Sequence, residues 1–155
     1  MRKATIGSVS SGTIRSQDLF SSFVWELEYL EGREYTHEDL DMPEDAFECE
    51  NDPWWDTESA SWLIEELFDK LERHSPPYCY FGACEGDGAD YGFWVAWDSL
   101  EESVVKVDEL PDGPFHPDET PDETHLALQV NDHGNATLYS WDIADQAWTE
   151  EWSMV

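Results

Sequence analysis

The clearest structural signal in the chain comes from residues 57–97, which read TESASWLIEELFDKLERHSPPYCYFGACEGDGADYGFWVAW. The first half spaces apolar side chains three or four residues apart, which predicts a helix from about Thr57 to His74. Pro76 and Pro77 end it, because proline lacks the amide hydrogen that a further turn needs. Beyond them, YCYFGAC and YGFWVAW flank the turn-forming EGDGAD, which predicts a β-hairpin.

The same helical spacing occurs nearer the N-terminus. It predicts a helix between Ser11 and Gly32, with Thr13 or Ser16 capping its start and glycine suiting its end. The apolar stripe of this helix consists of Phe20, Phe23, Val24, Leu27 and Leu30.

The C-terminal third has the pattern of short strands separated by turns. A weak strand at 103–107 is followed by three runs at 124–130, 136–143 and 147–155, which predict an antiparallel meander. Gly134 or Asn135 is expected to take the positive φ of the tight turn. The predicted fold is therefore α+β, with one antiparallel sheet of about five strands and two main helices packed on one face. A length of 155 residues favours a single acidic domain over residues 1–155.

The charge is extreme: 37 Asp and Glu face 7 Lys and Arg, which gives a formal charge of −30. Such a chain is repelled by DNA, RNA and anionic membranes, so we expect no direct binding to nucleic acid or membrane. The expected partner is a basic protein. A 40% apolar content with 9 Trp argues for a folded core rather than a disordered acidic tail.

The N-terminal MRKATIGSVSSG lacks the apolar run of a signal peptide, and no run approaches about 20 apolar residues. Cys49, Cys79 and Cys84 are odd in number and form no CxxC pair, which favours reduced thiols. These features predict a cytoplasmic protein, in whatever cell makes it.

Motifs for catalysis are missing. EGDGAD fails the calcium-loop pattern, because Ala89 and Ala96 stand where oxygen ligands are needed. The histidines lack metal-ligand spacing, and neither a nucleophile elbow nor a phosphate-binding loop occurs. We therefore predict no enzyme activity, no catalytic residue, no metal and no cofactor. A carboxylate-dependent metal hydrolase stays as an alternative, with Asp87 and Asp90 as its best site.

Acid is concentrated between Arg33 and Lys70, where no other Lys or Arg occurs. We name Glu34–Glu58 the acidic segment. Thr36 and Asp39 have the spacing of a capping box, and two adjacent tryptophans can hardly both point inward on a regular element. The predicted partner-binding residues are Glu38, Asp39, Asp41, Glu44, Asp45, Glu48, Glu50, Asp52, Trp54 and Trp55. The loop Asp108–Glu123 is the second choice.

Gathered on half of a surface of roughly 8,000 Å², the carboxylates would reach about one per 110 Å². Duplex DNA has about the same charge density. This match suggests a protein that imitates DNA, with carboxylates pairing with the arginines of a DNA-binding channel in place of phosphates. Two alternatives for the charge stay open, an immunity protein that neutralises a basic nuclease toxin and adaptation to high salt.

The runs PWWDTESASWLIEELFDKL, PPYCYFGACEGDGADYGFW and VNDHGNATLY resemble a group of small acidic proteins of phages and other mobile elements. The resemblance covers most of the chain from Gly7 and implies mobile-element biology without supplying site residues. In size and charge the chain is also similar to DNA-mimic inhibitors. Our leading hypothesis is a non-enzymatic anti-CRISPR or anti-restriction protein that blocks the Lys/Arg-lined DNA-binding surface of a host effector complex.

Overall fold

The computed structural model describes residues 2–115 and 126–155. The chain, for which the length predicts a single domain, divides into two compact units. Unit 1 comprises Met1–Ser75 and Cys79–Trp94, and unit 2 comprises Pro76–Tyr78 and Val95–Val155. The α+β class is confirmed, because helices and strands occur in both units.

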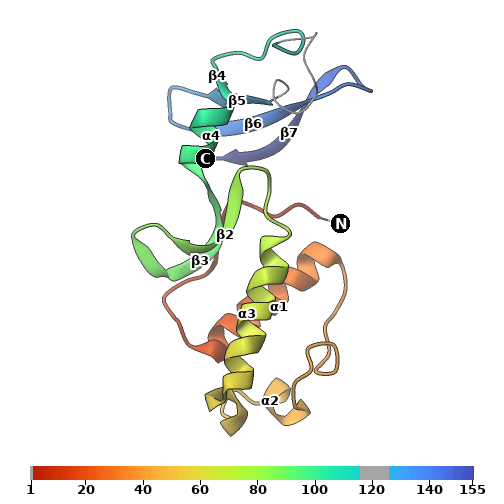
Figure 1. The fold of residues 1–155 in the computed structure, drawn as a ribbon, viewed down its shortest axis with the longest axis vertical. Coiled ribbons are helices and arrows are strands. Elements are labelled where there is room, and N and C mark those ends of the chain that lie inside the picture. Colours follow the sequence, from red (N-terminus) through yellow and green to blue (C-terminus); the bar gives the residue numbers. More distant parts are fainter. Residues whose placement is uncertain (1, 116–125) are drawn as a thin grey trace. The chain divides into compact units, whose positions relative to one another are not determined.

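Two long helices, α1 (Ser16–Glu31) and α3 (Glu58–Glu72), form the framework of unit 1 and lie side by side in Figure 1. They run in the same direction. The ring of Phe20, early in α1, lies 5.1 Å from that of Trp55, just before α3, and Glu31 lies 3.3 Å from His74 just beyond α3. Both apolar stripes face the core, as predicted.

The predicted ends of α1 are half right. Gly32 has a φ of 69° and its amide donates to the carbonyl of Glu28, so the predicted glycine cap is confirmed. The start is wrong, because α1 begins at Ser16 and Arg15 occupies the cap position without a side-chain bond. The hydroxyl of Thr13 instead accepts from the amide of Arg15 and donates to Asp18.

A three-stranded sheet completes unit 1, in the order β1 (Gly7–Ser10), β3 (Asp87–Val95) and β2 (Cys79–Cys84). The predicted hairpin is confirmed, but its turn is only Glu85 and Gly86, and β3 begins at Asp87. The four-residue strand β1, with its small side chains, is absent from the sequence-based prediction. Both helices pack on one face of this sheet, where Phe23 and Phe68 each contact Phe81 and Tyr91.

Unit 2 contains α4 (Trp97–Ser103) and a sheet in the order β4 (Val105–Val107), β5 (Leu126–Val130), β6 (Ala136–Asp142) and β7 (Ala147–Met154). The antiparallel meander of β5, β6 and β7 is confirmed, and Gly134 takes the positive φ of its first turn. β4 pairs in parallel with β5.

The prediction of one five-stranded sheet is wrong, because the strands form two sheets of three and four. β3 is already paired on both sides, with β1 and β2, so no edge of it is left for a later strand. The chain leaves β3 through α4, and the following strands pair with one another. The core of the second sheet includes Leu128, Leu138 and Trp152, which lie opposite one another in register.

Candidate partner-binding site

The acidic segment is the connection that returns between two parallel helices. The segment starts at the C-terminal ends of α1 and α3, where the phenol of Tyr35 donates to Glu31 over 2.6 Å. It finishes at the N-terminal ends of the two helices, where Trp55 packs against Phe20. A helix of 15 residues is about 22 Å long. The segment, which includes α2 (Glu44–Glu48) and the single-turn η1 (Pro53–Asp56), therefore extends along the length of the two helices (Figure 1).

Apolar side chains fix the acidic segment to the core. The indole of Trp55 also donates to the carbonyls of Ala46 and Cys49, over 3.1 and 3.2 Å. These anchors give the segment a defined path, as a free linker would not have. These anchors, all of them buried, are Tyr35, Leu40, Met42, Ala46 and Trp55.

Two of the predicted contact residues hold the local backbone. The Thr36–Asp39 capping box is confirmed, because Asp39 accepts from the amide and the hydroxyl of Thr36, both at 2.9 Å. The bond from the Thr36 amide, followed by that from its hydroxyl, lowers the pKa of Asp39. Asp52 caps η1 by accepting from the amide of Trp54 at 2.9 Å. Both carboxylates are thus engaged inside the segment.

The other carboxylates of the predicted site point to solvent. Each is exposed, and none has an ion pair with any described residue. They differ in this from Glu31, which lies within 4 Å of both Arg33 and His74, and from Glu66, which pairs with Lys70. These six carboxylates, which we call the outward acids, are Glu38, Asp41, Glu44, Asp45, Glu48 and Glu50.

The two adjacent tryptophans do not both enter the core, as expected, but neither is fully exposed. Trp55 is only 6% exposed, and Trp54 is half-buried against it with ring centroids 5.0 Å apart. They lie on a single 3₁₀ turn, where neighbours are separated by about 120°, so one ring enters the core and the other covers it. Trp55 therefore does not belong to a contact surface.

The exposed aromatic side chains of unit 1 lie outside the acidic segment. Trp25 is 66% exposed, Trp62 is 63% and Tyr29 is 40%. Trp25 and Tyr29 stack, with their planes 10° apart, and the guanidinium of Arg2 lies 4.6 Å from the Tyr29 ring centre. None of these three is among the predicted contact residues. All three fall outside the apolar stripes of α1 and α3, so the helical periodicity of the sequence already indicates that they are exposed.

The second predicted contact surface, Asp108–Glu123, is only partly described. Its residues 116–123 lie outside the described residues. The part before them contacts the sheet of unit 2, because the indole of Trp148 donates to the carbonyl of Pro111 over 2.8 Å and its ring packs against Phe115.

No metal site or membrane-spanning helix occurs in residues 2–115 and 126–155. No group of three or more His, Cys, Asp or Glu lies there in a metal-binding arrangement, and no helix there has the length and apolar composition to cross a membrane. Asp87 accepts from the amide of Ala89, and Asp90 accepts from the hydroxyl of Ser8. Burial raises the pKa of the Cys79 thiol to about 12, so it is protonated and a poor nucleophile at neutral pH.

Comparison with known proteins does not identify a relative: no protein-family model, no curated protein and no solved structure matches the chain.

Proposed function

We propose that the protein is a non-enzymatic inhibitor of a host nucleic-acid-binding defence complex, an anti-CRISPR or anti-restriction protein that acts in the host cytoplasm as a DNA mimic. One observation carries the proposal. The acidic segment is anchored on the core by apolar side chains, and its six outward acids have no cation partner among the described residues. A fixed set of unpaired carboxylates is what a Lys/Arg-lined channel would bind in place of phosphates.

The mechanism needs no catalytic group. Carboxylates of the acidic segment pair with arginine and lysine side chains that otherwise bind DNA, and displace the anions bound there. Glu44 and Glu48 are one turn apart on α2, so both lie on one face of that helix. Because many exposed ion pairs contribute together, affinity should fall steeply as salt increases.

The test is competition for the DNA site. Purified CRISPR effector complexes and restriction enzymes are each incubated with the protein and a fluorescent DNA substrate, and DNA loading is followed by anisotropy. The quadruple variant E44Q/D45N/E48Q/E50Q removes four outward acids and leaves the caps Asp39 and Asp52 in place. We expect it to lose at least about tenfold in affinity for the target that the wild type blocks, because each exposed pair contributes up to about 1 kcal/mol.

A charge-matched control separates the effect of the acidic segment on binding from the effect of the overall charge. The variant E85Q/E102Q/D132N/D145N removes the same number of charges, two Glu and two Asp, at exposed positions outside both predicted contact surfaces. We expect it to bind almost as the wild type does. An equal loss in both variants, or binding that leaves DNA loading intact, contradicts DNA mimicry by this segment. Protection of cells from a co-expressed basic nuclease toxin, without binding to any effector complex, would instead assign an immunity function.

A further inference from the structure

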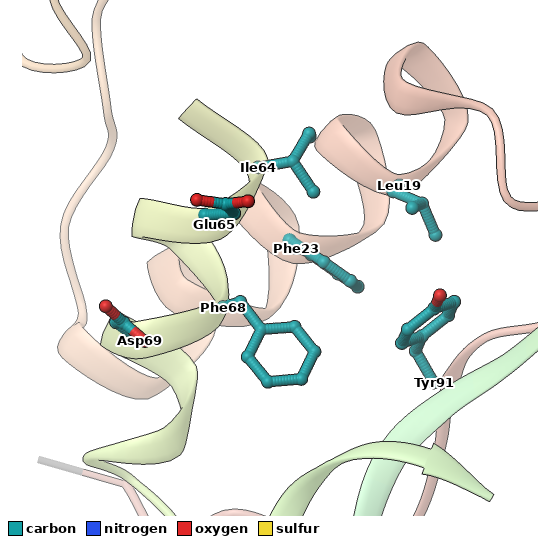
Figure 2. A pocket seen from close by; sticks show the side chains of 7 residues that line it. All are labelled: Leu19, Phe23, Ile64, Glu65, Phe68, Asp69 and Tyr91. Atoms are coloured by element: carbon teal, nitrogen blue, oxygen red, sulfur yellow. The ribbon is translucent and has the colours of Figure 1, made fainter. Parts of the chain in front are cut away.

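A second feature of unit 1 is a pocket of about 410 Å³ between α1, α3 and β3, shown in Figure 2. Its volume lies at the lower end of the range for ligand pockets, about 300–1,000 Å³, which leaves room for an apolar side chain and adjoining backbone. The acidic segment contributes none of the lining residues. The pocket is lined by Leu19, Phe23, Ile64, Glu65, Phe68, Asp69 and Tyr91.

Aromatic rings form the interior of the pocket. The ring of Tyr91 lies edge-on to Phe23 and Phe68, with centroids 6.0 and 6.4 Å away. Phe23 is fully buried, whereas Ile64, Phe68 and Tyr91 are half-buried and so reach solvent. The Tyr91 hydroxyl, visible in Figure 2, makes no hydrogen bond to a described residue. The pocket therefore has an apolar interior and one polar group free to bind a partner's backbone.

Two carboxylates lie on one side of the pocket. Glu65 and Asp69 are exposed and one turn apart on α3, and neither has an ion pair within the described ranges. Their neighbour Glu66 differs, since it pairs with Lys70 over 3.3 Å. A ligand that fills the pocket thus meets two uncompensated negative charges, which favours a cationic ligand and disfavours an anionic one.

We propose that this pocket binds an apolar side chain of a basic protein segment, with flanking Lys or Arg side chains on Glu65 and Asp69. A second copy of this chain does not fit, because two molecules of charge −30 repel each other. The proposal does not rest on DNA mimicry. It concerns a separate surface of unit 1 and requires only a basic partner, so it can stand or fail without the proposed function.

The test uses two peptides that differ at one position, acetyl-GKRLRKG-amide and acetyl-GKRSRKG-amide. Binding to the full chain is followed by NMR, with the methyl groups of Leu19 and Ile64 as reporters. We expect the leucine peptide to bind at least about tenfold more tightly than the serine peptide, because leucine removes apolar surface from water. Its shifts should be largest at the two reporter methyls. Equal affinity of both peptides, or shifts located elsewhere, overturns the proposal.

Three variants separate the contribution of the two carboxylates from that of the apolar interior of the pocket. E65Q/D69N should weaken both peptides and keep the preference for leucine, whereas the control E85Q/D132N, which also removes one exposed Glu and one exposed Asp, should weaken them less. Ile64→Trp fills the pocket and should remove the preference while leaving general attraction between opposite charges. If E85Q/D132N weakens binding as much as E65Q/D69N, the attraction is unspecific and the proposed site is wrong. If the tryptophan variant does not fold, E65Q/D69N still tests the proposed site. Both of its substitutions are at exposed positions, so this variant is expected to fold.

Discussion

Tyr35 shows how one side chain joins the acidic segment to the helices. Its phenol is 4% exposed and donates to Glu31 over 2.6 Å, and its amide donates to Glu28 over 2.8 Å. The guanidinium of Arg33 lies 4.0 Å from the centre of its ring. Burial alone would raise the pKa of Glu31, but hydrogen bonds from Tyr35, His74 and Arg33 together lower it. The start of the acidic segment is thus fixed to the end of α1.

The variant Tyr35→Phe tests this link. We expect the free energy of unfolding at pH 7 to fall by about 1–2 kcal/mol, because a hydrogen bond to a charged group is lost. The pKa of Glu31 should rise, since the bond from Tyr35 is one of the contacts that lower it. Urea unfolding and an NMR titration of the Glu31 carboxyl measure the two effects. Tyr80→Phe, a matched change in the same unit, should leave the pKa of Glu31 unchanged.

The pH dependence follows from the same pKa. A carboxyl whose folded pKa is lowered stabilises the fold above its unfolded pKa, and this contribution is lost as pH falls through the folded value. For wild type we expect stability to decline as pH falls below about 4.5. The part of this decline due to Glu31 should be smaller in Tyr35→Phe. Identical acid profiles would show that the phenol does not stabilise the ionised carboxylate.

At the scale of elements, the contact between β1 and β3 depends on Gly92. This buried glycine pairs with Ser8, and a Cβ placed on it would lie 2.1 Å from the carbonyl oxygen of Gly7. The nearest atoms all belong to the backbone of β1, which cannot rotate away as a side chain could. Only glycine at this position lets β1 pair with β3 as observed.

Gly92→Ala should therefore displace β1. We expect a loss of about 1–3 kcal/mol in the free energy of unfolding, the usual cost of overpacking, and faster amide exchange in Gly7–Ser10. Chemical denaturation and hydrogen exchange measure the two. Gly88→Ala is the matched control, because a Cβ at this position of the same strand would have no atom within 4 Å, and it should change stability by less than about 0.5 kcal/mol. Similar losses in both variants would refute the close approach.

A helix, strand or turn could be predicted when the residues that specify it are close together in the sequence. The stripe of α3 and the turn at Gly134 lie within a few residues of sequence, and both were predicted. β1 has no such signal, because its four residues GSVS become a strand only by pairing with β3, about 80 residues away. The parallel pairing of β4 with β5 likewise depends on a distant partner.

At the scale of the whole molecule, negative charge is distributed over both units. Lys106 is the single Lys or Arg in unit 2, and it pairs with Glu101 over 2.9 Å. The other six lie in unit 1, where Arg33 and Lys70 already contact Glu31, Asp39 and Glu66. Most carboxylates therefore repel one another without compensation, which opposes folding.

Salt should consequently stabilise the free protein. We expect the midpoint of thermal unfolding to rise by several degrees between about 10 mM and 0.5 M NaCl, because the screening length falls from about 30 Å to a few Å. Screening worth about 1 kcal/mol shifts the midpoint by roughly 2–4 °C in a chain of this size. Differential scanning fluorimetry measures it, and E44Q/D45N/E48Q/E50Q should show a smaller rise. A flat profile would contradict the prediction, and a midpoint that keeps rising in molar salt would favour adaptation to high salt.

Local pattern was sufficient for the α+β class, the two long helices, the hairpin, the C-terminal meander and the stretch without Lys or Arg between Arg33 and Lys70. Each of these depends on periodicity or composition over a few residues, which sequence records directly. The separation into two sheets, the burial of Trp55, the use of Asp39 and Asp52 as caps, and the pocket beside Glu65 and Asp69 came only from the folded chain. They depend on which surfaces meet in space, and contacts between distant residues leave no periodic trace in the sequence.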